Sequence, residues 1–339
     1  MCACVRTCVW KKFDNTKKNT ELYKMNYQNV RTRPKQFLSV TSLYIEEFDY
    51  LLSSFSSKWR NYYRIHTIEG KKRKAPIFNP EKNTKTLPTI EEKLFFILVY
   101  LKNYSLQEMT AASFGFSQSQ ASKWCKALRP LLFDSLKELH VLPNHQGEKV
   151  AQILTKLNEN KCFQDVTERL INRPSDQDVQ QDFYSGKKKA HTIKNNIITT
   201  ENQYVVYLSS TVEGTVHDKK IADQNEIKFP DNIHLFQDSG YQGFKPDNVY
   251  IVQPFKKPRN KEFSLLQKWF NQYVGQRRII VEHAISGIKR LRIVKDKCRH
   301  FCQRFRDQII DIAVGLHNLR VNSPFRLYKS KHKWSHNLF

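Results

Sequence analysis

The chain has 339 residues, of which 40% are hydrophobic, and its 57 Lys and Arg against 32 Asp and Glu give a formal net charge of +25. No apolar run is long enough to span a membrane, so we expect no membrane partner, and the length suffices for two domains with cores of their own. The excess of positive charge indicates a polyanionic partner, with nucleic acid ahead of an anionic surface.

The positive charge is unevenly distributed along the chain. Residues 1–86 carry a net charge of +11 and residues 245–339 a net charge of +15, whereas residues 87–244 are close to neutral. The basic flanks are therefore expected to contact the polyanion, and the centre holds many of the carboxylates.

Residues 1–36 are expected to form a basic extension. The first thirteen residues are too few for a secretory signal peptide and are interrupted by Arg6. Met25 offers a second possible translation start.

The seven cysteines are scattered along the chain, which favours a reducing cytoplasm over a disulfide framework. Two clusters could suggest a metal site: Cys2, Cys4 and Cys8, and Cys298, His300 and Cys302. Neither is followed by a second group of ligands at the spacing of a zinc site, so we expect no metal at either cluster. We expect Cys298 and Cys302 to lie on one helix.

Residues 37–145 are expected to form a helical domain. Between residues 37 and 64, apolar and aromatic side chains recur at helical spacing, and a charged linker containing proline follows. Three capping-box patterns then occur in series. They begin at Thr89, Ser105 and Ser117.

The second and third of these helices have the layout of a helix-turn-helix, with Gly115 in the turn. Ser117 and Gln118 stand at the start of the third helix, where base contacts are usually made. Lys123, Lys126 and Arg129 recur every three residues and share one face, so we predict that this helix contacts DNA. The alternative is a small helical bundle whose basic face is merely solvated.

Residues 155–322 are expected to form a mixed α/β domain. Alternating patterns predict a strand over 161–171, a hairpin within 190–214, and short strands at 232–238 and 248–255. A helix is predicted after His217, and a long helix over 264–294, in which Gly275 marks a break.

Three acids in this second domain are candidates for chemistry. Asp165 lies within the first strand, Asp238 ends a later strand, and Glu282 lies on a polar face of the long helix that also carries Arg278 and Lys289. Carboxylates gathered together repel one another unless a cation compensates them, and hard oxygen ligands suit Mg²⁺ or Mn²⁺. Two such ions would support phosphodiester cleavage. The alternative is three unrelated acids in caps or salt bridges.

Five sequence blocks in the second domain resemble, in order, those of DDE transposases of the insertion-sequence group related to Harbinger transposases. The blocks are FQDVTERLINRP, YSGKKKAHTIKN, VEGTVHDKKIAD, FQDSGYQGF and RRIIVEHAISGIKR. Residues 90–132 resemble the helix-turn-helix that precedes this catalytic domain. The resemblance implies an RNase H-like fold with a five-stranded mixed sheet and flanking helices, preceded by an all-α domain.

Carried onto this chain, the resemblance implies a catalytic and metal-binding triad of Asp165, Asp238 and Glu282, which would hold Mg²⁺ or Mn²⁺, two ions in all. Arg278 and Lys289 match the family's basic positions around the glutamate. Many relatives have a tyrosine three residues before that arginine, where this chain has Gly275, so no phenol is available at this position.

Further residues are candidates for accessory roles. His217 and Asp218 also match the family, and Asp218 either caps the following helix or approaches the metal or the DNA. Lys187, Lys188 and Lys189 suit phosphate contact, or else form a solvated charged run. Residues 323–339 are expected to form a basic tail.

We therefore expect a DNA transposase that binds the terminal inverted repeats of its own element, hydrolyses phosphodiester bonds at the ends and joins the 3′-hydroxyls to target DNA. Synapsis of two ends, as the resemblance implies, predicts a homodimer or larger assembly acting at the nucleoid in the cytoplasm. The alternatives are a catalytically silent or host-adopted DNA-binding protein, and a non-mobile DNA endonuclease on the same scaffold.

Overall fold

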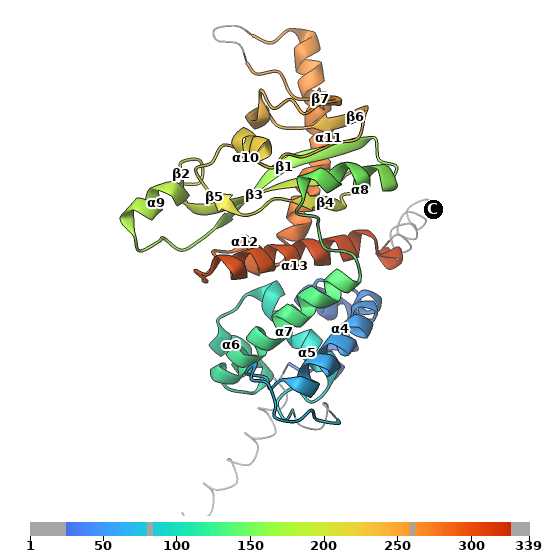
Figure 1. The fold of residues 1–339 in the computed structure, drawn as a ribbon, viewed down its shortest axis with the longest axis vertical. Coiled ribbons are helices and arrows are strands. Elements are labelled where there is room, and N and C mark those ends of the chain that lie inside the picture. Colours follow the sequence, from blue (N-terminus) through green and yellow to red (C-terminus); the bar gives the residue numbers. More distant parts are fainter. Residues whose placement is uncertain (1–24, 80–83, 258–261, 327–339) are drawn as a thin grey trace, which may run out of the picture. The chain divides into compact units, whose positions relative to one another are not determined.

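The computed structural model describes residues 25–79, 84–257 and 262–326 (Figure 1). Contacts between Cα atoms divide the chain after Leu132 into two compact units, each of which is described by itself. We expected the division between residues 145 and 155. It falls earlier because Leu136 and Leu142 lie against Gly315, within the second unit. The Cys2, Cys4 and Cys8 cluster and most of the basic tail lie outside the described residues.

The first unit is all helical, as the residue pattern predicts. Its described part begins at residue 25, and Tyr27 and Val30 are already buried, so the extension is shorter than the expected 36 residues. The left-handed Ser42 (φ 66°) separates the second and third helices. The helices are α2 (Tyr27–Arg31), α3 (Pro34–Thr41), α4 (Ile45–Ile65), α5 (Ile90–Asn103), α6 (Gln107–Phe114) and α7 (Gln118–Glu138), whose last turns belong to the second unit.

Two of the three predicted capping boxes are present. Thr89 and Glu92 bond reciprocally at the start of α5, and Ser117 and Gln120 do so at the start of α7. The box predicted at Ser105 is wrong, because α6 begins one residue later with Leu106 as an N-cap that makes no side-chain bond. Gly115, left-handed at φ 73°, ends α6 and supplies the expected turn.

A buried lysine lies in the core of the first unit. The Lys93 ammonium lies 4.9 Å from the ring centroid of Trp59 and 5.8 Å from that of Trp124. It donates to three consecutive carbonyl oxygens, those of Leu87, Pro88 and Thr89. These bonds satisfy a charge that would otherwise be costly to bury.

The second unit contains a seven-stranded sheet, two strands more than predicted. The additional strands, β2 and β5, are two residues long and pair with the same edge of β3 as β4 does. The central order is β4-β3-β1-β6-β7: the first two pairings are antiparallel and the last two are parallel. The strands are β1 (Lys161–Leu170), β2 (Tyr184–Ser185), β3 (Ala190–Thr200), β4 (Val205–Leu208), β5 (Val212–Glu213), β6 (Ile233–Phe236) and β7 (Val249–Val252).

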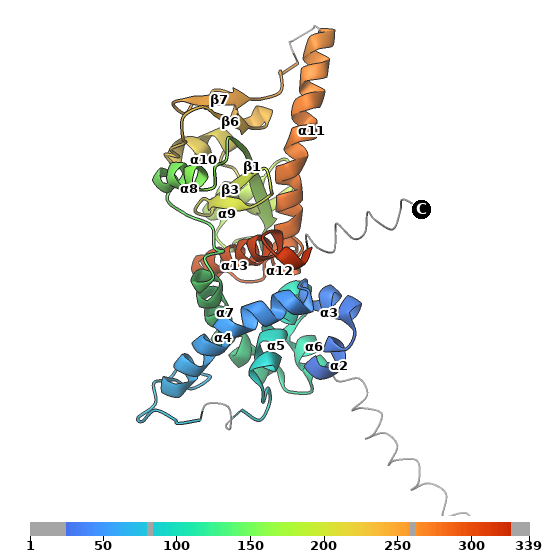
Figure 2. The same cartoon turned by 90° about the vertical axis from the view of Figure 1, so that its right-hand side faces the viewer.

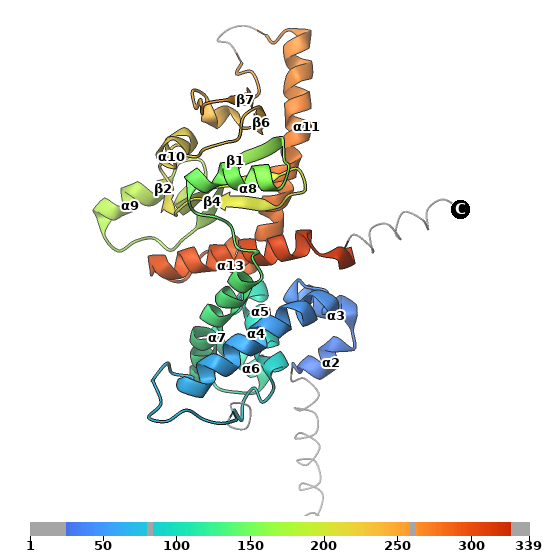
Figure 3. The same ribbon diagram turned by 45° about the vertical axis from the view of Figure 1, so that its right-hand side comes forward.

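Helices cover both faces of this sheet. The helices α8 (Val150–Lys156) and α10 (Asp218–Gln224) lie on one face and α11 (Leu265–Ile288) on the other (Figure 2). The helix α13 (Gln303–Val321) contacts α11 and β4 (Figure 3). The remaining elements are η1 (Gly147–Lys149), α9 (Gln177–Phe183), η2 (Ser239–Tyr241) and α12 (Arg292–Lys295). Among the described residues, no helix is both long and apolar enough to cross a membrane.

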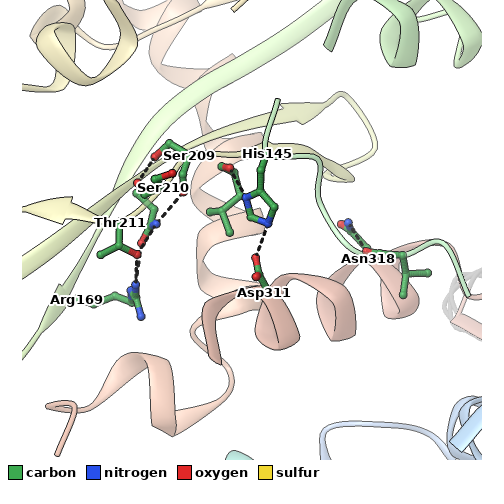
Figure 4. A network of polar contacts seen from close by, with 10 residues as sticks. His145, Arg169, Ser209, Ser210, Thr211, Asp311 and Asn318 are labelled. Atoms are coloured by element: carbon green, nitrogen blue, oxygen red, sulfur yellow. Dashed lines mark hydrogen bonds and ion pairs between the residues drawn. The ribbon is translucent and has the colours of Figure 1, made fainter. Parts of the chain in front are cut away.

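Polar contacts join α13 to the strands (Figure 4). Asn318 bonds both the N–H and the carbonyl oxygen of Val205 in β4. The His145 ring lies 3.0 Å from an Asp311 oxygen and 2.9 Å from the Leu208 carbonyl oxygen. The Asp311 carboxylate, through its bond to the ring, raises the pKa of His145. Together with the backbone of Asn144, which bonds Val206 and Leu208, these contacts satisfy the outer edge of β4.

Two of our predictions about the last helices are wrong. Helix α11 runs without a break through Gly275, because nothing crowds the helix there. Cys298 and Cys302 do not share a helix: the Cys298 N–H donates to the carbonyl oxygen of Leu170 at the end of β1, and Cys302 is the N-cap of α13.

Two glycines of α11 are expected to respond in opposite ways to substitution by alanine. A Cβ on Gly287 would fall on the His317 ring of α13, whereas Gly275 has open space. Gly287→Ala should destabilise the protein by about 1–3 kcal/mol, and Gly275→Ala should stabilise it by about 0.5–1 kcal/mol. Urea unfolding of the two variants measures this. Equal effects would contradict the close approach of α11 and α13.

Candidate active site

The tripeptide Phe-Gln-Asp occurs twice, at 163–165 in β1 and at 236–238 at the end of β6. The two strands are parallel neighbours with Phe163 opposite Phe236. The two phenylalanine rings stack with centroids 4.9 Å apart, and the Gln237 amide donates to the Gln164 side-chain oxygen at 2.6 Å. Because alternate residues share a face, the same register places Asp165 and Asp238 together, on the face that carries the phenylalanine pair.

Arg278 of α11 contacts both of these carboxylates. Its Nη2 lies 3.3 Å from Asp165 Oδ2, and its Nη1 lies 3.7 Å from Asp238 Oδ1. Val281, on the next turn of α11, packs against the Phe163 and Phe236 rings and holds the helix there. Asp165 and Arg278 are largely buried, with 19% and 14% of their side chains exposed, whereas Asp238 is 44% exposed. The two acids thus lie within the span of one guanidinium, at an edge open to solvent.

The electrostatics of this pair favour a second cation. Burial raises the pKa of Asp165 to about 6, with further increases from Asp238 and Asp218, although Arg278 and the Val166 N–H lower it. One guanidinium therefore does not compensate the carboxylates gathered at this edge.

Asp218 lies close to this site. It is not the N-cap of α10, as one of our alternatives held, because that position is taken by the exposed His217, which makes no capping bond with its side chain. Asp218 pairs with Lys194 of β3 at 3.2 Å, and a Cβ on Gly240 would lie 3.3 Å from its Oδ2. Gly240 thus permits Asp218 to approach the turn that follows Asp238.

A ladder of amide side chains supports the two acids from the other face of the sheet, and we did not predict it. It runs from Gln253 through Gln237 and Gln164 to Asn196, and the Tyr241 hydroxyl bonds the same Asn196. Gln164, Asn196 and Gln237 are fully buried, so the bonds between them are needed to offset desolvation. The repeated Phe-Gln-Asp tripeptide was the sequence signal for this ladder.

Glu282, the third predicted acid, is not brought to the other two. It lies one turn beyond Arg278 on α11, and its side chain is exposed. Lys289, two turns further on, donates to the Glu168 carbonyl oxygen at 2.9 Å, and burial lowers its pKa. Among the described residues, no three His, Cys, Asp or Glu side chains converge closely enough to hold a metal ion.

The basic candidates of the second unit lie in the turn before β3. Lys187, Lys188 and Lys189 are exposed there, and the charge of Lys188 contributes to the lowered pKa of Lys289. This turn therefore lies close enough to Lys289 for the two ammonium groups to repel one another.

In the first unit, the candidate DNA-contacting residues have unequal exposure. Ser117 and Gln118 are exposed at the start of α7, and Gln118 donates to Gln107 of α6. Lys126 is exposed, Lys123 pairs with Glu69, and Arg129 is half-buried. The start of the helix is thus more accessible than its later turns.

The chain matches two families of known proteins. Residues 164–318 match the family described as DDE superfamily endonuclease, and residues 85–138 match the helix-turn-helix of DDE superfamily endonuclease. The chain is also similar to a probable transposase for insertion sequence element IS702 from Microchaete diplosiphon, with 27% identity over 261 residues, which cover 76% of this chain and 89% of the relative. No solved structure gives a significant match. The relation to Harbinger transposases stays a prediction.

Removal of Arg278 is expected to cost more stability as the pH rises. A buried acid with a raised pKa destabilises the fold once it ionises, and without the guanidinium the pKa of Asp165 should rise above about 6. Arg278→Gln should therefore lose about 1–3 kcal/mol at about pH 8 and less at about pH 5, measured by urea unfolding without divalent metal.

The neighbouring Arg277 provides a matched control. Its pairing with Glu201 is long, at 3.8 Å, and exposed, so Arg277→Gln should change stability little at either pH. A loss in Arg278→Gln that does not depend on pH would contradict the electrostatic reading of the site.

Proposed function

The chain belongs to the DDE superfamily of endonucleases, with the helix-turn-helix of that superfamily preceding the catalytic domain, and from this premise we propose how its residues cleave and join DNA. The chain is a homologue of an insertion-sequence transposase. We propose that it binds the terminal inverted repeats of its own element and transfers the cut 3′ ends to target DNA. This proposal rests on one observation: the register of β1 and β6 places Asp165 beside Asp238, and Arg278 contacts both carboxylates.

Asp165 and Asp238 are the residues that would hold the divalent ions. Their carboxylate oxygens are ligands that Mg²⁺ and Mn²⁺ prefer. Burial, and in smaller part Asp238 and Asp218, raise the pKa of Asp165, and a bound cation would stabilise its ionised form. Such ions lower the pKa of a bound water or hydroxyl and stabilise the leaving oxygen. Glu282 would complete the site by turning its exposed carboxylate toward the pair.

The surrounding side chains have positioning roles in this proposal. Arg278 contacts both aspartates and would orient them, and its charge offsets part of the repulsion between them. Asp218 would contribute further negative charge, held in place by Lys194. Lys188 and its neighbours would contact phosphates of the strand at the site, because they are exposed on the side where Lys289 lies.

The strand order supports an RNase H-like fold for the catalytic domain. Three antiparallel strands (β1, β3 and β4) are followed by two parallel ones, and the first acid lies on β1. The second acid follows the first parallel strand, β6, and the third lies on the helix after the sheet. This is the placement that the family resemblance implies.

We propose that the helix-turn-helix recognises the element ends through the start of α7. Ser117 and Gln118 are exposed there and would reach base edges, while Lys126 would contact phosphate. Synapsis of two ends would require a homodimer or a larger assembly.

Cleavage should depend on each acid of the proposed triad. Asp238→Asn should lower Mg²⁺-dependent cleavage of a duplex containing an element end by about 100-fold or more, and Asp165→Asn and Glu282→Gln should do the same. The matched control is Asp247→Asn, which makes the same change at an exposed acid beyond η2 and should leave cleavage unchanged. Cleavage at the wild-type rate by the three triad variants would show that the triad assignment is wrong, whereas no cleavage by the wild type would favour a DNA-binding protein without an active site.

The two kinds of α7 contact should be distinguishable by binding assays. Gln118→Ala should weaken binding to the element's own terminal repeat more than binding to a scrambled duplex, because it removes a base contact. Lys126→Gln should weaken binding to both duplexes equally, because phosphates carry no sequence information. Fluorescence anisotropy with the two duplexes measures this difference. If Gln118→Ala weakened binding to the two duplexes equally, as Lys126→Gln should, a role for Gln118 in sequence recognition would be contradicted.

A further inference from the structure

A pocket of about 470 Å³ lies where the ends of α11 and α13 meet the turn between β3 and β4. Arg290 and Ser286 line it from the α11 side, Arg320 and His317 from α13, Arg326 from the segment beyond α13, and Gln203 from the turn. Figure 3 shows the end of α11 beside α13. None of the residues assigned above to the triad or to α7 lines this pocket.

The pocket is strongly positive. It is lined by three arginines, and no acid is among the described residues that line it. Burial, and after it the charges of Arg320, Arg290 and Arg326, lower the pKa of His317 to about 3. The ring is therefore neutral, and its Nε2 donates to the Gln203 carbonyl oxygen at 2.8 Å.

The pocket is held in shape by buried contacts. Arg320 is 3% exposed and donates to the Gly287 carbonyl oxygen at the end of α11 at 2.7 Å. Gly287 itself lies against the His317 ring, where no larger residue fits. Arg290 is exposed and Arg326 half-buried, so their guanidinium groups can be reached from solvent.

We propose that this pocket binds a phosphate group of the DNA backbone, as a subsite separate from the paired aspartates. Guanidinium groups match phosphate oxygens in charge and in fork geometry. The pocket also lies close to the proposed site, because Ser286, which lines it, lies one turn beyond Glu282 on the same side of α11. A strand whose scissile phosphate faces Glu282 would thus place a nearby phosphate over Arg290. This inference rests on the proposed function, because DNA is the ligand of both sites.

The salt dependence of DNA binding by the full-length protein tests the proposal. Each phosphate contact contributes about 0.9 to the slope of log K against log salt concentration. Arg290→Gln and Arg326→Gln should each reduce that slope by about one and weaken binding at a fixed salt concentration. The matched control is Arg304→Gln, at the opposite, exposed end of α13, which removes the same charge outside the pocket and should leave the slope unchanged.

A second pair of variants guards against loss of folding. Ser286 is exposed, so Ser286→Glu adds a negative charge at the pocket without disturbing the core, and Ser286→Gln is its neutral counterpart. The charged variant should weaken DNA binding, and the neutral one should not.

Three outcomes decide the proposal. Equal slopes in Arg290→Gln and Arg304→Gln would overturn it, even where Mg²⁺-dependent cleavage by the wild type supports the proposed function. Stabilisation of the wild type by inorganic phosphate, lost in Arg290→Gln while the DNA slope stays the same, would also overturn it in favour of a small phosphorylated ligand. Failure of the wild type to bind or cleave DNA would instead overturn the proposed function.

Discussion

The parallel pairing of β1 with β6 is the constraint on which the candidate active site depends. Phe163 lies opposite Phe236, and the following pairs in the two strands are glutamines and then aspartates. A slip of one residue would turn one tripeptide over, because side chains alternate between the two faces of a sheet. The stacked rings on one face and the glutamine bond on the other therefore select a single register. That register places two negative charges together. Their repulsion raises the electrostatic free energy of the folded state, and contacts within the site offset part of this increase.

Arg278 meets part of that cost and relates the folding of the site to its proposed chemistry. Its guanidinium contacts both aspartates from α11, which Val281 holds against the phenylalanine pair. The pKa of Asp165 nevertheless stays raised, because burial and the neighbouring Asp238 and Asp218 outweigh one cation. A divalent ion would complete the compensation, so the same electrostatic imbalance that limits stability would promote metal binding. Nearer its C-terminal end α11 lines the basic pocket, so this helix connects the proposed triad with a proposed phosphate subsite.

The residue pattern predicted some elements well and others poorly, for identifiable reasons. The capping boxes at Thr89 and Ser117 were correct because they are local, within four residues. The break expected at Gly275 was wrong, because a glycine lowers helix stability without ending a helix, and α11 continues through this position. The strands β2 and β5 were missed because two residues are too few to show a period. Lys93 was read as part of a helix without its burial, which depends on two distant tryptophans.

The sequence by itself determined the order of the domains, the type of most elements and the identity of the candidate acids. These properties can be recognised from residues that are close together in the chain, through local spacing or through the resemblance of short blocks to a known family. Only the tertiary structure decided which of those acids meet. Asp165 and Asp238 are brought together by strand register, and Asp218 approaches the turn after Asp238 because Gly240 leaves room. Glu282 remains exposed, and the pocket of three arginines arises only where α11, α13 and the turn between β3 and β4 converge. Such convergence depends on packing between segments that are far apart in the sequence, and the spacing of residues within one segment does not predict it.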